Sequence, residues 1–211
     1  RPAGPVVAAA VVLAPGTRIA GLDDSKRLTP ASRMRLDAEI RRVAWGVGVG
    51  QVEPAQIDRL DILQAALAAM RAALRRLPRP PEVVLVDGPA VPASGLLEVP
   101  IVDGDARSLT IAAASVVAKV YRDRLMVEQA AAYPPYDFGS NKGYGSPRHL
   151  AALAAHGPCA LHRLSFAPVS AAAAAASAAA AGDAAGALLG RLNRCPDEAA
   201  LEAVAAEIRQ R

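Results

Sequence analysis

Two aspartates that each stand beside a glycine are the residues of this sequence best placed to do chemistry. Asp87 follows the wholly apolar run 83–86, and Asp105 follows a second short apolar run, 99–102. An apolar run without a polar face predicts a strand that is buried on both sides. If both strands belong to one sheet, the two carboxylates lie at a single edge, where open α/β sheets bind ligands. In the simpler alternative, Asp87 starts a turn and Asp105 caps a helix.

Other polar side chains are candidates for binding. Ser115 and Lys119 are four residues apart in an expected helix and can share a face toward a ligand, although a solvated lysine is the more common arrangement. Asp123 follows an arginine on the same helix, which favours a structural ion pair over a catalytic acid. The three histidines show no metal-ligand spacing, and His162 beside Arg163 is better suited to supporting phosphate contacts.

The composition fits one well-buried domain with further residues to spare. Of 211 residues, 53% are hydrophobic, 21% are charged and only 3% are aromatic, so the core must consist mainly of Val, Ile, Leu and Ala. A net charge of +4 and a pI near 9.4 permit a polyanionic partner without demanding one. Cys159 and Cys195 have neither metal nor disulfide spacing, which predicts a reducing compartment. Residues 6–13 are too short to span a bilayer, and we expect no membrane segment.

Alternating patterns predict the elements that must position these side chains. Strands are expected at residues 1–13, 46–50, 83–86 and 99–102. Helices are expected at residues 29–45, 54–77, 109–132 and 148–156, with a glycine-rich basic loop at 137–147. The basic residues of the first helix are most simply a solvated face. This alternation of strands and helices argues for an α/β domain with helices packed on a sheet.

The composition changes beyond Ser170. Residues 171–181 are nearly pure alanine, and residues 196–210 form an amphipathic stretch that predicts a helix. We therefore expect a catalytic or binding domain at residues 1–169 and an alanine-rich helical extension at residues 170–211.

Eight segments together resemble one family. They are AGPVVAAAVVL, GLDDSKRL, DILQAALAAM, VLVDG, GDA, IAAASVVAKVYRDRLM, YDFGSNKGYGSPRH and HRLSFAPV. In this order and approximate spacing they resemble bacterial ribonuclease HII, the type 2 ribonuclease H, over residues 2–169. The resemblance implies an α/β fold of the ribonuclease H type, with a central mixed sheet flanked by helices. It also implies a monomeric cytoplasmic endonuclease of DNA repair that needs Mg²⁺ or Mn²⁺. The implied substrates are the RNA strand of RNA–DNA hybrids and ribonucleotides embedded in duplex DNA.

The resemblance also implies roles for individual residues. Asp87 and Asp105 match the third and fourth members of a four-carboxylate site of the two-metal type, whose hard oxygen ligands suit Mg²⁺ or Mn²⁺. Lys26 matches a lysine beside the site that could meet a phosphate. Tyr144 matches a tyrosine that packs against the sugar where the 2′-hydroxyl distinguishes RNA from DNA. The remaining substrate-binding candidates are Ser25, Ser115, Lys142 and Arg163.

The sequence departs from the family's pattern at the first two carboxylates. That pattern has an Asp-Glu pair, followed closely by a Gly-Arg-Gly segment, just before the position of Arg1, and this chain contains neither. The family's first strand, which is central in its sheet, belongs to the same missing piece. We therefore expect an N-terminally truncated family member. The alternative is a catalytically defective fragment or a nucleic-acid-binding module. Smaller departures are Asp61 and Asn141, where the family usually has Asn and His, and Asp103, where a basic residue is common.

Overall fold

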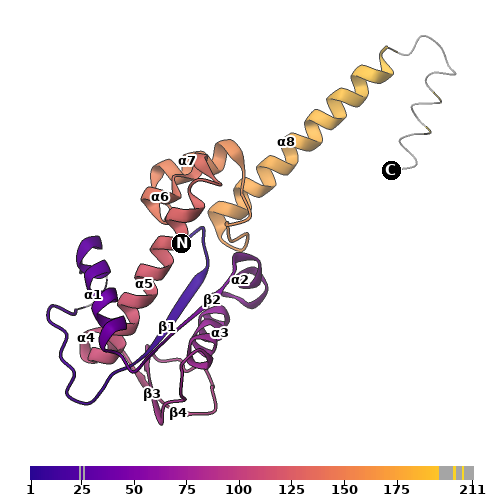
Figure 1. Cartoon of the computed structure of the whole chain (residues 1–211). Coiled ribbons are helices and arrows are strands. Elements are labelled where there is room, and N and C mark those ends of the chain that lie inside the picture. The colour runs from indigo at the N-terminus through magenta and orange to yellow at the C-terminus, as the bar shows by residue number, and fades with distance from the viewer. Residues whose placement is uncertain (24, 26, 195–201, 203–205, 207–211) are drawn as a thin grey trace.

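The computed structural model describes residues 1–23, 25, 27–194, 202 and 206. The four strands lie in the first half of the chain, interspersed with helices α1 to α3, and helices follow β4 (Figure 1). The elements are β1 (Val6–Val12), α1 (Pro30–Val43), β2 (Gly46–Val52), α2 (Pro54–Leu60), α3 (Ile62–Arg75), β3 (Val83–Asp87), β4 (Leu97–Ile101), α4 (Gly104–Arg107), α5 (Leu109–Gln129), the 3-10 turn η1 (Pro134–Tyr136), α6 (Phe138–Asn141), α7 (Pro147–His156) and α8 (Ala167–Leu192).

Strands β1 and β2 form an antiparallel pair at the centre of the molecule, with Val6 opposite Val52. Alternate side chains of β1 point to opposite faces of this pair, as the pleat requires. Val11 packs into a cluster with residues of α1 and α5, whereas Ala8 packs into a cluster with Ala65 and Ala69 of α3. Helices α1 and α5 therefore cover one face of the pair and α3 covers the other (Figure 1).

Helix α3 lies unusually close to β2 because β2 carries glycines on the facing side. A Cβ atom at Gly48 would lie 2.1 Å from the carbonyl oxygen of Ala73, and one at Gly50 would lie 2.1 Å from that of Ala69. No side chain fits in that space. The glycines that weakened the prediction of a strand here are what allow the helix to dock on it.

The single helix predicted at residues 54–77 is wrong, because Asp61 divides it into α2 and α3. Asp61 has a φ of 73°, outside the helical region, and its carboxylate accepts hydrogen bonds from the backbone N–H groups of Leu63 and Gln64 at 2.7 and 2.9 Å. These bonds satisfy two donors that the first turn of α3 would otherwise leave unpaired. An aspartate inside an apolar helical pattern was the sequence signal for this break.

Strands β3 and β4 pair in parallel, with Leu85 opposite Val99, so the prediction that the two strands share a sheet is confirmed. The same strands do not pair with β1 or β2: in the described part of the chain the sheet consists of two separate two-stranded halves. The prediction that residues 83–86 are buried on both sides is wrong for Val83 and Leu85, which are 44% and 41% exposed.

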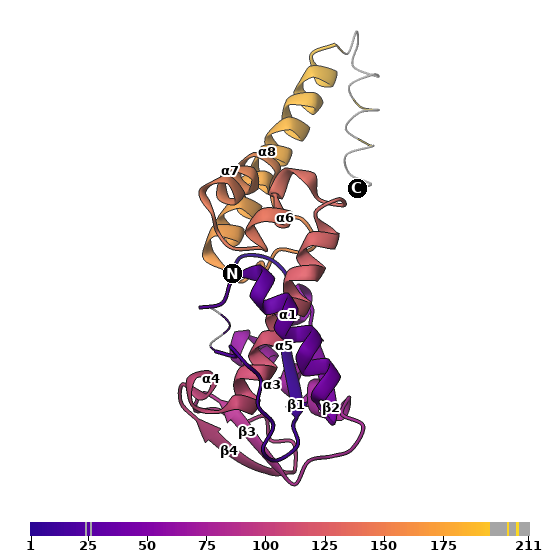
Figure 2. The same ribbon diagram turned by 60° about the vertical axis from the view of Figure 1, so that its left-hand side comes forward.

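Helix α8 extends away from the rest of the molecule in both views (Figures 1 and 2). It begins at Ala167 and continues through the expected domain boundary, and Val169 in its first turn is buried. Residues 167–191 are long and apolar enough to cross a membrane by length and composition alone, with a mean hydropathy of 1.3, although we expected no such segment. Core helices and signal sequences meet the same criterion, so it is weak support for a membrane helix. The helix predicted at residues 196–210 lies outside the described residues.

Candidate active site

A groove of about 650 Å³ lies between the two halves of the sheet. One wall is β1, whose residues 7–12 line it together with Leu13, and the other is β3, through residues 83–87. Helices α3 and α5 contribute apolar side chains to it. The polar side chains along the groove are Arg1, Ser25, Asp87, Thr110, Ser115, Lys119, Arg122 and Tyr144. The fold therefore gathers several predicted site residues from distant parts of the chain around one space.

Asp87 and Asp105 are connected through the backbone of α4. Asp87 is the last residue of β3, is exposed, and accepts a hydrogen bond at Oδ1 from the N–H of Gly104 at 2.9 Å. Gly104 begins α4, and Asp105 lies in the first turn of that helix. The N-cap of α4 is Asp103, whose side chain makes no capping bond. Asp105 is therefore not the helix cap of the simpler alternative, and the first turn of α4, which contains Asp105, lies at the end of β3 that carries Asp87.

The type of these donors suits Mg²⁺ or Mn²⁺, but their number is small. Carboxylate oxygens are the ligands that these hard cations prefer. Within residues 1–194, apart from Asp24 and Lys26, no group of three or more His, Cys, Asp and Glu side chains is arranged to hold a metal. Asp87 and Asp105 can therefore contribute to a divalent-metal site, and further ligands must complete it.

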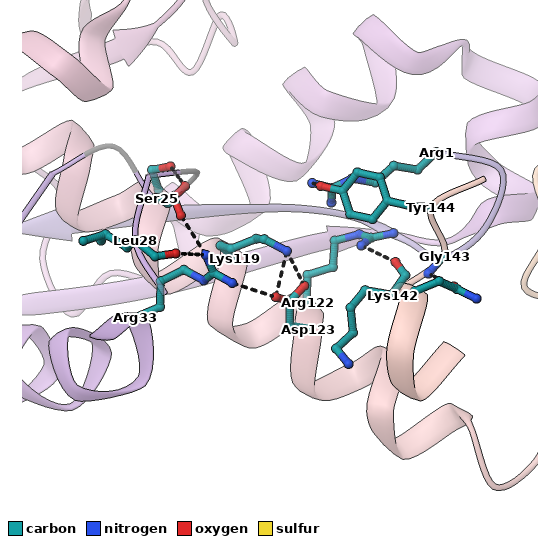
Figure 3. Close-up of polar contacts among 12 residues, drawn as sticks. Arg1, Ser25, Leu28, Arg33, Lys119, Arg122, Asp123, Lys142, Gly143 and Tyr144 are labelled. Carbon is teal, nitrogen blue, oxygen red and sulfur yellow. Dashed lines mark hydrogen bonds and ion pairs between the residues drawn. The ribbon is translucent and has the colours of Figure 1, made fainter. Parts of the chain in front are cut away.

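A polar network holds the segment around Ser25 against α5 (Figure 3). The hydroxyl groups of Ser25 and Ser115 lie 2.8 Å apart. The guanidinium of Arg33 donates to the carbonyl oxygens of Ser25 and Leu28 at 2.9 and 2.6 Å. Arg33 thus anchors this segment to α1, and it is not the solvated residue that we expected, since only 12% of its side chain is exposed. The predicted phosphate ligand Lys26 lies outside the described residues.

The same network includes a half-buried ion pair on α5. The Nζ atom of Lys119 lies 2.6 and 2.7 Å from the two carboxylate oxygens of Asp123, and Arg33 lies 3.8 Å from that carboxylate (Figure 3). The prediction that Asp123 makes a structural ion pair is confirmed, with Lys119 and Arg33 as partners. Ser115 and Lys119 both line the groove, so the prediction that they share a face is also confirmed.

Tyr144 presents its ring at the opening of the groove. The residue is 44% exposed, and the guanidinium of Arg1 lies 4.3 Å from the ring centroid and donates to the hydroxyl oxygen (Figure 3). The ammonium of Lys119 is 5.7 Å from the same centroid. Cations over an aromatic face are attracted by its quadrupole. An exposed ring flanked by cations can pack against a nucleotide whose phosphates those cations attract.

Two buried arginines hold the chain just before β1. Arg122 donates to the carbonyl oxygens of Ala3 at 2.8 Å and Pro5 at 3.1 Å, and Arg163 donates to that of Gly4 at 2.9 Å. Burial, reinforced by neighbouring arginines, lowers the pKa of Arg122 to about 10 and that of Arg163 to about 10. Both therefore stay charged at neutral pH. Sequence reasoning did not single out Arg122.

Two of the predicted substrate ligands are engaged elsewhere. Arg163 is only 3% exposed, so its guanidinium serves the backbone before β1. The ammonium of Lys142 donates to the carbonyl oxygen of Gly139 within its own loop, and the carbonyl oxygen of Lys142 accepts from Arg122 at 2.8 Å (Figure 3). A phosphate contact by either residue stays a prediction, and it requires at least Lys142 to turn away from its loop.

A pair of histidines, His149 and His162, is hydrogen-bonded to the backbone of the Tyr144 loop. The Nδ1 atom of His149 lies 2.7 Å from the carbonyl oxygen of Tyr144, and its Nε2 lies 3.0 Å from Nε2 of His162, whose Nδ1 accepts from the N–H of Cys159. The network fixes the protons: His149 carries its proton on Nδ1, and His162 donates from Nε2. Burial, followed by the proximity of His149, lowers the pKa of His162 to about 4. His162 is therefore a neutral structural residue and not the phosphate-supporting one that we expected.

Comparisons with known proteins agree on one family. The family model for ribonuclease HII matches residues 2–169. Ribonuclease HII of Syntrophobacter fumaroxidans is 52% identical over 169 residues, covering 80% of this chain and 72% of that protein. Ribonuclease HII of Idiomarina loihiensis is 47% identical over 167 residues, covering 79% and 89%.

Solved structures extend the agreement to the fold. The crystal structure of ribonuclease H2 from Pyrococcus horikoshii matches with a TM-score of 0.72 and 25% identity, covering 82% of this chain and 92% of that one. Ribonuclease HII in its complex with PCNA from Archaeoglobus fulgidus matches with a TM-score of 0.61 and 28% identity, covering 77% and 86%. The α/β fold of the ribonuclease H type is therefore confirmed, and the chain belongs to the ribonuclease HII family of nucleases.

Proposed function

We propose that this chain supplies metal-binding and substrate-binding residues of a metal-dependent endonuclease that cuts the RNA strand of RNA–DNA hybrids and ribonucleotides embedded in duplex DNA. The observation that carries this proposal is the contact between Asp87 and Gly104, because it holds the first turn of α4, which carries Asp105, against Asp87, and Asp87 lines a groove that Arg1, Lys119 and Arg122 also line. Cleavage of embedded ribonucleotides would give the protein a role in DNA repair.

Each part of the groove has a task in this proposal. Asp87 and Asp105 would hold a divalent ion, Mg²⁺ or Mn²⁺, which supplies an activated water and stabilises the leaving oxygen. Lys119 and the hydroxyl of Ser115 would position the phosphate backbone. The ring of Tyr144 would pack on the sugar at the junction, where a 2′-hydroxyl marks the ribonucleotide.

The second candidate is a nucleic-acid-binding protein that does not cleave. It is favoured by the shortage of metal ligands, since the described residues contain no group of three that could hold an ion. It is also compatible with the net charge of +4. Both candidates predict binding to a polyanion, so only cleavage separates them.

One pair of proteins distinguishes the candidates. The first is the chain of residues 1–211, and the second, the extended protein, is the same chain preceded by a segment that carries the family's Asp-Glu pair and Gly-Arg-Gly segment. Each is incubated with duplex DNA containing one ribonucleotide, with an RNA–DNA hybrid and with an all-DNA duplex, in Mg²⁺, Mn²⁺ or EDTA.

We expect the extended protein to cut the first two duplexes in either metal and neither in EDTA, and the shorter chain to bind without cutting. Binding by both proteins with cleavage by neither would establish the second candidate. Metal-dependent cleavage by the shorter chain would show that acids within residues 1–211 complete the site. The monomeric state and the cytoplasmic location stay predictions.

A further inference from the structure

A second pocket, of about 430 Å³, lies between the last turns of α3 and the loop that leads into β4, and we call it the α3 pocket. It is at the end of β3 opposite to Asp87, because β3 starts at Val83, directly after this pocket, and ends at Asp87. A strand advances about 3.3 Å per residue, so roughly 13 Å of β3 separates the two ends. The residues that line the pocket all come from the stretch 71–96: Arg71, Leu74, Arg75, Pro80, Pro81, Ala93, Ser94 and Leu96.

Hydrogen bonds hold the walls of the α3 pocket in place. The guanidinium of Arg71 donates to the carbonyl oxygen of Pro92 at 2.8 Å, and Pro92 is fully buried. The carboxylate of Glu98 accepts from the backbone N–H groups of Ala93 and Ser94 at 3.0 and 2.8 Å, and from the Ser94 hydroxyl at 2.6 Å. The loop before β4 is therefore fixed against α3, and the pocket is formed before any ligand enters, as binding pockets usually are.

The positive charge of the chain is concentrated beside this pocket. Residues 71–81 contain four arginines and no acidic residue, so this stretch carries a charge of +4, which equals the net charge of all 211 residues. The four are Arg71, Arg75, Arg76 and Arg79, and none of them takes part in an ion pair in the described part of the chain. Arg71 and Arg75 are one helical turn apart and both line the pocket. A ligand with negative charges complements this wall.

The remaining lining is apolar and suits a polypeptide. Leu74, Pro80, Pro81 and Leu96 offer hydrocarbon surface between the arginines and the loop before β4. Proteins that bind single-stranded nucleic acid stack its bases on aromatic rings, and no aromatic residue belongs to the described lining of this pocket. Arginine pairs with a carboxylate through two parallel hydrogen bonds, whereas apolar side chains beside the carboxylate require a surface of this kind.

We infer that the α3 pocket binds a short segment of a partner protein in which acidic and apolar residues alternate, with carboxylates on Arg71 and Arg75 and apolar side chains against the leucines and prolines. This site is separate from the groove at Asp87. It rests on the charge and lining of the pocket and not on the proposed nuclease activity.

The test measures binding of a synthetic peptide to the chain of residues 1–211. The probe is a fluorescein-labelled peptide of sequence Asp-Leu-Asp-Leu-Asp, and its fluorescence anisotropy is followed as protein is added. The neutral peptide Asn-Leu-Asn-Leu-Asn is the matched control. We expect saturable binding of the acidic peptide, at least tenfold tighter than that of the neutral one, and we expect it to weaken as salt screens the charges.

Variants of exposed arginines locate the bound peptide. Arg75 is exposed, so Arg75→Glu should keep the thermal midpoint of the parent while it weakens binding of the acidic peptide by about tenfold or more. Arg75→Lys keeps the charge without the paired hydrogen bonds and should lie between the two. The control is Arg59→Glu, because Arg59 is an exposed arginine of α2 that also has no described ion pair, and it should bind as the parent does.

Three results would overturn the inference: no saturable binding of the acidic peptide, equal affinity for the neutral peptide, or equal affinity in Arg75→Glu and the parent. The cleavage assay separates this site from a nucleic-acid contact. We expect Arg75→Glu in the extended protein to cut a duplex containing one ribonucleotide with the kcat and KM of the parent. A severalfold higher KM would assign these arginines to nucleic acid and end the peptide assignment. Absence of cleavage by the extended protein itself, with peptide binding intact, would count against the proposed function alone.

Discussion

Asp87 has two separable tasks. One of its carboxylate oxygens accepts a hydrogen bond from Gly104, and its negative charge is expected to hold the metal ion. In Asp87→Asn the amide oxygen can still accept this bond, while the negative charge is lost. In the extended protein we expect Asp87→Asn to reduce cleavage by about 100-fold or more at nearly unchanged stability, because a ligand charge in a metal site contributes several kcal/mol. Initial rates of cleavage and the thermal midpoint measure the two effects.

Asp103→Asn is the matched control for this substitution. Asp103 is exposed, makes no capping bond with its side chain, and has a φ of 53°, a conformation that asparagine tolerates. We expect it to keep cleavage within a few-fold of the parent. A rate for Asp87→Asn as high as that for Asp103→Asn would remove Asp87 from the metal site.

Tyr144 is expected to act through its ring. The ring is exposed and lies under the guanidinium of Arg1. Stacking on a nucleotide contributes ~1–3 kcal/mol, so Tyr144→Ala should slow cleavage at an isolated ribonucleotide by about 10- to 100-fold in the extended protein. Tyr144→Phe keeps the ring and should cost less. Identical rates for the alanine variant and the parent would place the sugar contact elsewhere.

His162 makes the stability of the domain depend on pH. Its pKa falls from 6.5 to about 4 in the folded protein, chiefly because of burial, so folding favours the neutral ring. The unfolded chain then binds the extra proton between these values. We expect the full stabilisation above about pH 6.5 and its loss as the pH falls through about 4. Urea unfolding at pH 7, 5 and 4 measures this, and His162→Gln should flatten the dependence.

Single residues were predictable where their chemistry is unusual for their position. Asp87 and Asp105 were recognisable because each stands beside a glycine after an apolar run, and the structure connects them. The structural role of Arg33 was not recognisable, since an arginine on an amphipathic helix has the same local sequence pattern whether it is solvated or bonded to a distant loop. Its role depends on the carbonyl oxygens of Ser25 and Leu28, which only the tertiary fold brings near.

At the scale of elements, the contact between α3 and β2 sets a strict limit on side-chain size. A methyl group at Gly50 would lie 2.1 Å from a backbone oxygen of α3, which cannot move without shifting the helix. We expect Gly50→Ala to lower the free energy of unfolding by about 3 kcal/mol, the upper range for overpacking. Gly145→Ala, where the nearest atom is 3.4 Å away on a proline ring, is the control and should cost much less. Equal losses in urea unfolding would contradict the close approach.

Elements with terminal signals were predicted well. Thr29 and Pro30 start α1 as expected, with the Thr29 hydroxyl accepting from the N–H of Ser32. Ser146 caps α7 in the same way. The break at Asp61 was missed because the apolar spacing continues on both sides of it, and periodicity alone does not record a change in φ.

At the scale of the whole molecule, α8 is expected to contribute little to the domain. Its residues beyond Ser170 are largely exposed, with Ala176 beside Gly157 among its few contacts. Deleting residues 171–211 leaves Val169 in place and should lower stability by about 1 kcal/mol or less, as for other surface changes. Cleavage by the extended protein should be unaffected. Loss of cleavage with binding and folding intact would make α8 part of the catalytic machinery.

The groove could not have been predicted from residue patterns. Residues 83–86 carry the pattern of a strand buried on both sides, and that pattern is correct for a sheet that continues past β3. The apolar run 83–86 does not by itself show whether another strand lies next to β3.

The division of the sheet has a consequence for how the chain folds. Each two-stranded half closes within a short stretch of sequence, residues 6–52 for one and residues 83–101 for the other, and α5 contacts both β1 and β3. Cooperativity between the halves therefore passes through α5, which is synthesised after both strand pairs, and through α3, whose Arg71 donates to the carbonyl oxygen of Pro92 at 2.8 Å. The β3–β4 half, with no strand partner on its inner edge, is the unit expected to open first, as a separate foldon whose unfolding leaves β1, β2 and α3 in place.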